Sequence, residues 1–246
     1  MKDKRSLISL AIVLLASSAV LYVLHFLVFR DLHNLAFYTF MDVAFMPVEI
    51  LVVSLIVNRV LADRERRALL HKLNMVIGAF FSEVGTELLG RLRSFDASFD
   101  RTRPHLVFRP GWTAEHYRQA EDAIRALQPD IELPRGDIEG LHAFFADRRG
   151  FLLGLLENPN LLEHDAFTDL LWAVFHLAEE LAARESLTAL TGPDRTHLEL
   201  DIQRAYTRLL CEWLEHVRHL QEDYPYLFSF ASRTNPFDPE AVAAAS

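Results

Sequence analysis

The feature that most limits the fold of this chain is a long apolar run near its N-terminus. Residues 6–29 form 24 positions in which His25 is the only acidic or basic side chain. A helix rises about 1.5 Å per residue, so this run exceeds the roughly 30 Å hydrocarbon core of a bilayer. The run therefore predicts a transmembrane helix.

A second apolar run, residues 35–57, is also long enough to cross a bilayer, although it contains Asp42, Pro47 and Glu49. Only the sequence RDLHN separates the two runs, so we expect a tight turn and an antiparallel transmembrane hairpin. A cleaved signal peptide is the alternative, because residues 17–19 are small. Ten further residues without a formal charge follow them, however, and signal sequences have apolar regions of only about 7–15 residues.

The distribution of basic residues predicts the orientation of this hairpin. Three basic residues lie within positions 1–5 and five within 59–72, whereas the connecting turn has only Arg30. Both termini should therefore be cytoplasmic, in a multi-pass protein of the inner (cytoplasmic) membrane. Of the formal net charge of −9, residues 73–246 carry −12. Residues 73–246 thus form an acidic domain that follows the basic segment 59–72, and anionic membrane lipid repels such a domain. The same negative charge argues against nucleic acid as a partner.

The remainder of the chain has a helical pattern, so the expected fold class is all-α. A juxtamembrane connecting helix should cover residues 59–95, followed by a linker over 96–112 with a short extended piece at 105–109. The cytoplasmic helical domain, residues 113–246, should contain a bundle of four helices. Their expected limits are Thr113 to Pro129, Asp137 to Asn158, His164 to Glu185, and Asp194 to Asp223. The segment from Tyr226 is expected to be a mixed tail in which Leu227, Phe228 and Phe230 dock.

An apolar stripe with heptad spacing continues from the second membrane helix into the connecting helix. Its late positions are Leu70, Leu73, Ile77, Phe80 and Val84. Such spacing is typical of a helix that pairs with another helix, so this stripe is a candidate seam for a homo-oligomer. The alternative is that the helix packs inside its own domain, where Gly78, Ser82 and Gly85 would suit close packing.

The acidic residues of the second run are the strongest candidates for a functional site. Asp42 and Glu49 are seven residues apart, so they share one helix face. An acid at the centre of a membrane helix costs up to about 3 kcal/mol on insertion scales. Compensation could come from protonation or from His25, Ser17 and Ser18 on the first helix. We therefore predict an intramembrane ion or proton site, the alternative being a shallow Asp42 and a neutral, packed Glu49.

Metal ligation and nucleophilic catalysis have weaker support. His176 lies on a stripe opposite an apolar face, which indicates the solvated side of its helix; the other members of the stripe are Asp165, Asp169, Trp172 and Glu179. Glu212, His216 and His219 cluster at the edge of an apolar face. Glu139 and His142 form one Glu-x-x-His, and a dimetal bundle needs two. We expect no metal, no cofactor and no catalytic residue.

The single cysteine, Cys211, excludes an intrachain disulfide. Its position in the middle of a helix favours a buried structural thiol. The sequence contains no Walker, G-x-G-x-x-G or G-x-S-x-G pattern. An enzymatic function is therefore not expected.

Two functions fit these features. The first is an oligomeric membrane protein that conducts or senses an ion and has a cytoplasmic helical regulatory domain. The second is a membrane-tethered interaction module or scaffold that recruits a cytoplasmic protein partner and has no transport activity. The acids Asp42 and Glu49 favour the first function, whereas a groove among the Phe-rich helices would favour the second. A membrane-bound metalloenzyme is a more distant third.

Overall fold

A computed structural model describes residues 2–158, 161, 164–187 and 189–241 of the chain. Its regular elements are helices. Extended pairing in this part of the chain is limited to one isolated antiparallel bridge between Asp96 and Ile131. The prediction of an all-α fold is confirmed. The chain divides into two compact units, Met1–Arg66 and Arg67–Ser246, which are described in turn.

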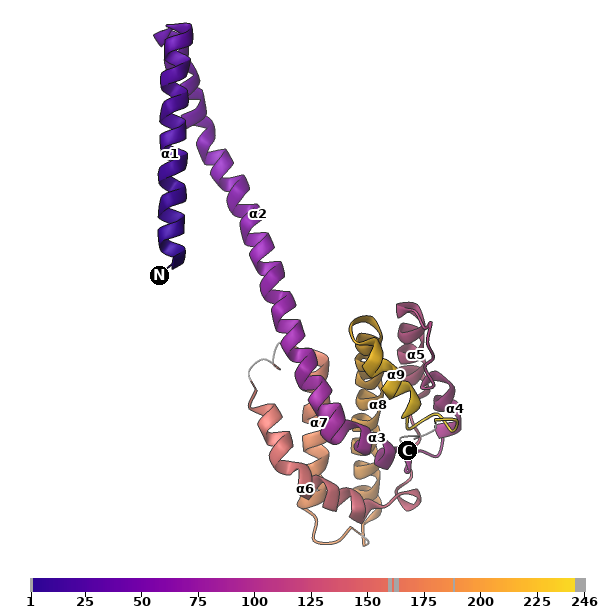
Figure 1. The fold of residues 1–246 in the computed structure, drawn as a ribbon. Coiled ribbons are helices and arrows are strands. Elements are labelled where there is room, and N and C mark those ends of the chain that lie inside the picture. The colour runs from indigo at the N-terminus through magenta and orange to yellow at the C-terminus, as the bar shows by residue number, and fades with distance from the viewer. Residues whose placement is uncertain (1, 159–160, 162–163, 188, 242–246) are drawn as a thin grey trace. The chain divides into compact units, whose positions relative to one another are not determined.

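The first unit consists of α1 (Lys2–Phe29) and the beginning of α2 (Leu32–Phe80), which form a helical hairpin (Figure 1). Arg30 ends α1 with a positive φ of 45°, and its amide donates to the Phe26 carbonyl at 2.9 Å. Asp31 caps the first turn of α2, because one carboxylate oxygen accepts from the amides of His33 and Asn34 at 3.0 and 3.1 Å. This cap starts α2 three residues earlier than the apolar pattern predicts, so only two residues join the helices.

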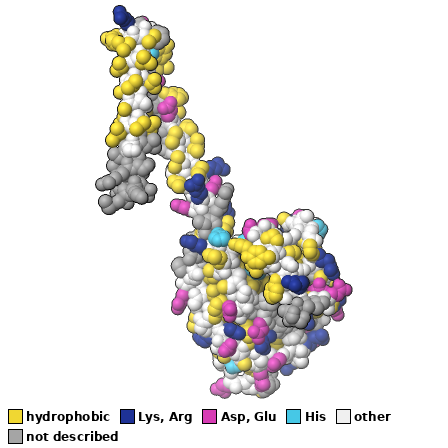
Figure 2. Space-filling view, viewed as in Figure 1, with side chains coloured by type: hydrophobic (Ala, Val, Ile, Leu, Met, Phe, Trp, Pro, Cys, Tyr) yellow, Lys and Arg dark blue, Asp and Glu magenta, His cyan; other side chains and the backbone are white. Residues whose placement is uncertain are grey.

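Hydrophobic side chains cover much of the visible surface of the first unit (Figure 2). By length and composition, the described chain contains one helix, Leu32–Arg93, that is long and apolar enough to cross a membrane. The most apolar window of that helix is 0% buried, unlike the core helix of a soluble domain. The apolar part of α1 among the described side chains, Ile12–Val28, is shorter. The transmembrane hairpin therefore stays a prediction.

The second unit is a helical domain that begins within α2. Local signals explain where its helices start: Thr113 and His116 form a capping box at α5, Asp137 accepts from the Gly140 amide at 2.8 Å at α6, and Thr191 caps α8. The elements after α2 are the π-helix η1 (Phe81–Gly85), α3 (Thr86–Arg93), α4 (Phe99–Thr102), the 3-10 helix η2 (Arg103–His105), α5 (Ala114–Leu127), the 3-10 helix η3 (Leu133–Arg135), α6 (Ile138–Leu156), α7 (Asp165–Ala182), α8 (Gly192–Asp223) and α9 (Pro225–Arg233).

Helix α8 organises the core of this domain. It contacts α3, α5, α7, α9 and η1, so residues on several of its faces are buried. The buried residues of α8 include polar ones, namely Asp201, Glu212 and His216. Burial of polar groups is costly unless they find partners, so these positions are candidates for function.

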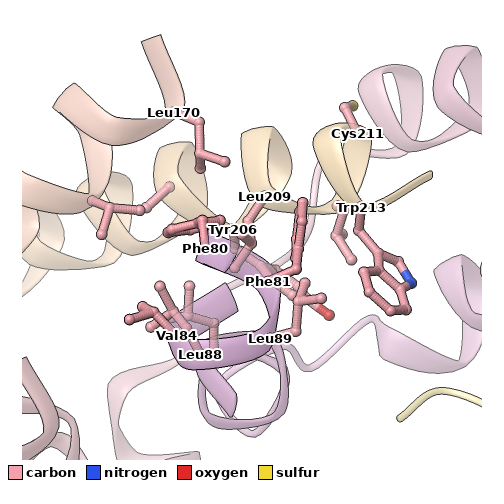
Figure 3. Close-up of a cluster of buried hydrophobic side chains, with 14 of the residues drawn as sticks. Phe80, Phe81, Val84, Leu88, Leu89, Leu170, Tyr206, Leu209, Cys211 and Trp213 are labelled. Carbon is pink, nitrogen blue, oxygen red and sulfur yellow. The ribbon is translucent and has the colours of Figure 1, made fainter. Parts of the chain in front are cut away.

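The π-helix η1 directs two consecutive aromatic side chains into the core (Figure 3). The rings of Phe80 and of Phe167 on α7 meet edge-to-face, with their centroids 5.3 Å apart. The Phe81 ring centroid lies 5.3 Å from that of Trp213, and the same ring is stacked on His216 of α8 at a centroid distance of 4.9 Å. The Phe81 carbonyl accepts from the Thr86 amide and also from the Thr86 hydroxyl, at 2.8 Å, across the widened turn. The helix, predicted to run to about Phe95, thus runs to Arg93 with a widened turn where it packs against two neighbours.

The heptad stripe packs inside the domain. Leu73, Ile77, Phe80 and Val84 are at most 5% exposed, and only Leu70 remains exposed, at 43%. This burial corrects the interpretation of the stripe as an oligomer seam, because four of its five side chains already contact the core of their own chain. These four side chains follow the alternative stated in the sequence analysis, in which the helix packs inside its own domain.

The predicted linker 96–112 is part of the same compact unit as the helices that follow it. The Ala97 amide donates to the Asp130 carbonyl at 2.8 Å, and the Glu132 amide donates to the Phe95 carbonyl at 2.9 Å. Residues 105–109 form no strand. Buried Leu106 and Phe108 instead attach this segment to the core. The predicted tail contains α9, in which Phe228 is buried while Leu227 and Phe230 stay exposed.

Candidate functional site

The hairpin brings four of the five predicted intramembrane site residues to one cavity of about 480 Å³. Ser17, Ser18 and His25 of α1 line it together with Asp42 of α2. Glu49 does not line this cavity. It lies seven residues further along α2, a rise of about 10 Å, and is exposed. The cavity therefore holds one of the two acids.

The helical domain contains a larger cavity, which we call the apolar groove. Its volume is about 790 Å³, and its walls come from the end of α2, η1, α3, α8 and α9. Volumes of about 300–1,000 Å³ with mainly apolar walls and a few polar groups are typical of binding sites. The lining residues are Asn74, Met75, Gly78, Phe81, Ser82, Thr86, Trp213, His216, His219, Leu220, Tyr224, Leu227, Phe230, Ala231 and Thr234.

Two residues that line the apolar groove have buried polar atoms without a partner. Among the described residues, neither Nδ1 of His216 nor Nε1 of Trp213 has a hydrogen-bond partner. Burial, with a smaller contribution from His219, lowers the pKa of His216 to about 4. The imidazole is therefore neutral at physiological pH.

One end of the groove is polar. Nδ1 of His219 lies 2.9 Å from Oδ2 of Asp223 and 3.2 Å from Nδ2 of Asn74. A smaller cavity of about 180 Å³ shares Asn74, His216 and His219 with the groove and is also lined by Glu212. Burial, followed by the charges of Glu215 and Glu121, raises the pKa of Glu212 to about 7. The groove thus has an apolar body and a polar end, which borders the smaller cavity that Glu212 lines.

The rim of the groove exposes large apolar side chains. Met75, Leu227 and Phe230 are 58%, 40% and 56% exposed. Figure 2 shows hydrophobic side chains gathered where Figure 1 draws α9. Single exposed apolar residues are ordinary, but a contiguous patch around a groove marks an interaction site.

Part of this site could be found in the sequence. The sequence predicts Glu212, His216 and His219 at the edge of an apolar face; the structure buries Glu212 and His216 and leaves His219 partly exposed. Helix α9 was missed, although Pro225 in the first helical turn is a recognised start signal. Cys211 is 4% exposed, and burial raises the pKa of its thiol to about 12, as fits a structural thiol.

These features describe an all-helical protein with a hairpin unit and a groove-bearing helical domain. The two units correspond to two family descriptions: "MJ1433, N-terminal helical domain" matches residues 2–61, and "Uncharacterized protein MJ1433, C-terminal helical domain" matches residues 69–233. A relative from Methanocaldococcus jannaschii, uncharacterized protein MJ1433, is 40% identical over 242 residues, which cover 98% of this chain and 97% of the relative. The chain belongs to the MJ1433 family. No solved structure matches it.

Proposed function

We propose that this protein is a membrane-tethered interaction module. The hairpin of α1 and α2 would anchor it in the cytoplasmic membrane with both termini in the cytoplasm, and residues 67–246 would bind a cytoplasmic protein through the apolar groove. The observation that supports this proposal is the groove itself, with its exposed rim of Met75, Leu227 and Phe230. Basic residues on both sides of the hairpin support the anchoring and its direction.

The chemistry of the groove favours an amphipathic helix as its occupant. Apolar anchors spaced along one helix face bind to hydrophobic grooves of this kind, and a flexible methionine such as Met75 adapts to them. The formal charge of −12 on residues 73–246 favours a helix with basic flanks. The same charge opposes insertion of the groove into anionic lipid, so a protein partner is preferred over the membrane surface.

The test uses the full chain in nanodiscs of zwitterionic lipid. The probe is a fluorescent 18-residue helix of leucine and lysine with one apolar face, and its binding is measured by anisotropy. A scrambled peptide of the same composition and empty nanodiscs are the peptide and lipid controls. Phe230→Glu removes an anchor from the rim, and Trp172→Glu is the matched control, because Trp172 is 59% exposed but lies on α7 outside the groove.

Burying a phenylalanine side chain contributes about 1.5–3 kcal/mol, so Phe230→Glu should weaken binding of the amphipathic peptide at least about tenfold. Trp172→Glu should leave the affinity unchanged. Equal affinity of the wild type and Phe230→Glu would refute the groove as the binding surface. If the peptide bound equally well to empty nanodiscs and to nanodiscs that contain the protein, its binding would be to lipid.

The cavity of the hairpin favours a second function, ion or proton sensing or conduction by a homo-oligomer formed through the hairpin. Ser17, Ser18 and His25 offer oxygen and nitrogen atoms beside Asp42, which would otherwise be costly in a bilayer. Asp42→Asn should abolish flux of an ion into dye-loaded vesicles. Glu49→Gln, outside the cavity, should have a smaller effect. Absence of wild-type flux over a range of voltages and pH values would count against this function.

A further inference from the structure

Two histidines and two carboxylates meet where α7 packs against α8. Each helix carries a histidine followed four residues later by a carboxylate: His176 and Glu180 on α7, His197 and Asp201 on α8. Contacts between the helices pair His176 with Asp201, Glu180 with His197, and Asp169 with Arg208, as in two antiparallel helices. Positions four apart share one helix face, so this register brings all four side chains together.

Asp201 is the centre of this cluster. Its side chain is 1% exposed, and Oδ1 accepts a hydrogen bond from Arg204 at 2.7 Å. Oδ2 lies 3.3 Å from Nε2 of His197 and 3.5 Å from Nε2 of His176. Even so, Oδ2 accepts no hydrogen bond from the described residues. A buried carboxylate oxygen without a partner is costly and uncommon, so something else should satisfy it.

Two of the separations between these atoms match those between metal ligands. Zinc bonds to nitrogen and oxygen are about 2.0–2.2 Å long, so tetrahedral ligand atoms lie roughly 3.3–3.5 Å apart. The three candidate atoms lie within 4.8 Å of one another, and the two imidazole planes are nearly perpendicular, at 86°. We propose that His176, His197 and Asp201 bind a divalent transition-metal ion, with Glu180 as the fourth ligand.

The surroundings of the cluster fit this assignment. Oε2 of Glu180 lies 3.9 Å from Nε2 of His197 and accepts a hydrogen bond from Arg184 at 2.7 Å. Arg204 and Arg184 thus hold the two carboxylates in place, as outer partners of metal ligands do. Both imidazoles are partly exposed, and a cavity of about 390 Å³ adjoins Glu180, so an ion can reach the site.

The ligand set selects the class of metal. Two imidazoles and two carboxylates without a thiolate suit Zn²⁺, Fe²⁺ or Mn²⁺, and the two short atom separations favour the tetrahedral geometry of Zn²⁺. The sequence of α7 alone assigned His176 to the solvated side of its helix. The carboxylate that complements it belongs to α8, and only the packing of the two helices brings them together.

The experiment titrates Zn²⁺ into the full chain, expressed without a histidine tag, treated with a chelator and held in detergent micelles. Calorimetry gives the stoichiometry and the affinity. Asp201→Asn and His197→Gln remove ligands, and His197 is exposed enough that its replacement should not disturb folding. Asp223→Asn is the matched control, because His219 and Asp223 form a histidine–carboxylate pair with the same spacing on the same helix, and among the described residues this pair belongs to no group of three possible metal ligands.

We expect one zinc ion per chain, affinity at least tenfold weaker in Asp201→Asn and in His197→Gln, and no change in Asp223→Asn. Zinc should raise the thermal midpoint of the wild type but not of the two ligand variants, whose metal-free circular dichroism should match the wild type. Co²⁺ in the site should show the visible absorption of a tetrahedral complex. Competition with Mn²⁺ and with Fe²⁺ under anaerobic conditions ranks the three metals.

Two results would overturn the proposal. One is the absence of saturable binding of all three metals to the wild type. The other is binding to His197→Gln and Asp201→Asn as tight as to the wild type, which would reduce the cluster to imidazole–carboxylate ion pairs on two packed helices. Neither result bears on the apolar groove, because the two sites share no residue.

Discussion

The opposite pKa shifts of His216 and Glu212 predict a pH dependence that two substitutions can separate. The residues lie one turn apart on α8, and both are buried. Burial lowers the pKa of His216 from 6.5 to about 4. It raises the pKa of Glu212 from 4.5 to about 7. The folded domain therefore favours the neutral form of each side chain.

The two contributions to the free energy of unfolding have opposite signs. As the pH falls from 6.5 towards 4, the unfolded chain protonates His216 while the folded domain does not, so stability is lost. As the pH rises from 4.5 towards 7, the unfolded chain ionises Glu212 while the folded domain does not, and stability is again lost. Each of these two changes in pKa corresponds to about 3 kcal/mol. In the wild type the two contributions largely cancel.

Replacement of either residue by glutamine should expose the other contribution. Relative to the wild type, His216→Gln should gain about 3 kcal/mol of stability as the pH falls from 6.5 to 4. Glu212→Gln should gain a similar amount as the pH rises from 4.5 to 7. For each variant, the free energy of unfolding minus that of the wild type can be plotted against pH. The two difference curves should slope in opposite directions.

Urea unfolding followed by tryptophan fluorescence is the assay. All three tryptophans, Trp112, Trp172 and Trp213, lie in the second unit, so the signal reports the helical domain even in the full chain in micelles. Difference curves that stay flat to within about 0.5 kcal/mol would refute the reasoning. That result would mean that water or movement relieves the burial of these two groups.

Two further predictions concern packing and use the same assay. Phe80→Ala should lower stability by about 3–5 kcal/mol and the urea midpoint by about 2 M, because its ring is fully buried against Phe167, whereas exposed Phe230→Ala should cost under about 1 kcal/mol. If Phe80→Ala instead dissociated an oligomer and left the urea midpoint unchanged, Phe80 would belong to an interface between subunits. Gly136→Ala should cost about 1–3 kcal/mol, because the added Cβ would lie 2.4 Å from the Phe95 ring. Gly150→Ala, which meets no atom within 4 Å in α6, should instead stabilise by about 0.5–1 kcal/mol; equal effects would contradict the clash.

The sequence predicted the parts of the fold that depend on local signals. Thr113, Asp137 and Pro129 mark helix limits through their own backbone preferences, so α5 and α6 begin and end close to the expected residues. The segment 96–112 was misjudged as a linker because its order depends on distant partners. Asp96 accepts from the Asp130 amide, and the Leu106 carbonyl accepts from Asn235. Such contacts leave no pattern within a short window of sequence.

The candidate sites divide in the same way. The depth of residues in an antiparallel hairpin follows from counting, so Ser17, Ser18 and His25 could be placed near the acids of the second helix. The structure groups these three residues with Asp42 and leaves Glu49 outside their cavity. The apolar groove needs α9 and the π-helix, and neither could be derived from apolar periodicity.

The polar pairs between α7 and α8 also determine which alignment of these helices is allowed. In the observed alignment, Asp169 meets Arg208 and His176 meets Asp201. A slide of α8 by four residues in one direction would place Asp169 opposite Glu212 and Glu180 opposite Asp201, so that acids face acids. The opposite slide would place His176 opposite His197 and Asp201 opposite Trp172. The leucine-rich faces tolerate such slides far better than these polar side chains do, so we expect the two pairs to exclude misaligned forms of the bundle during folding.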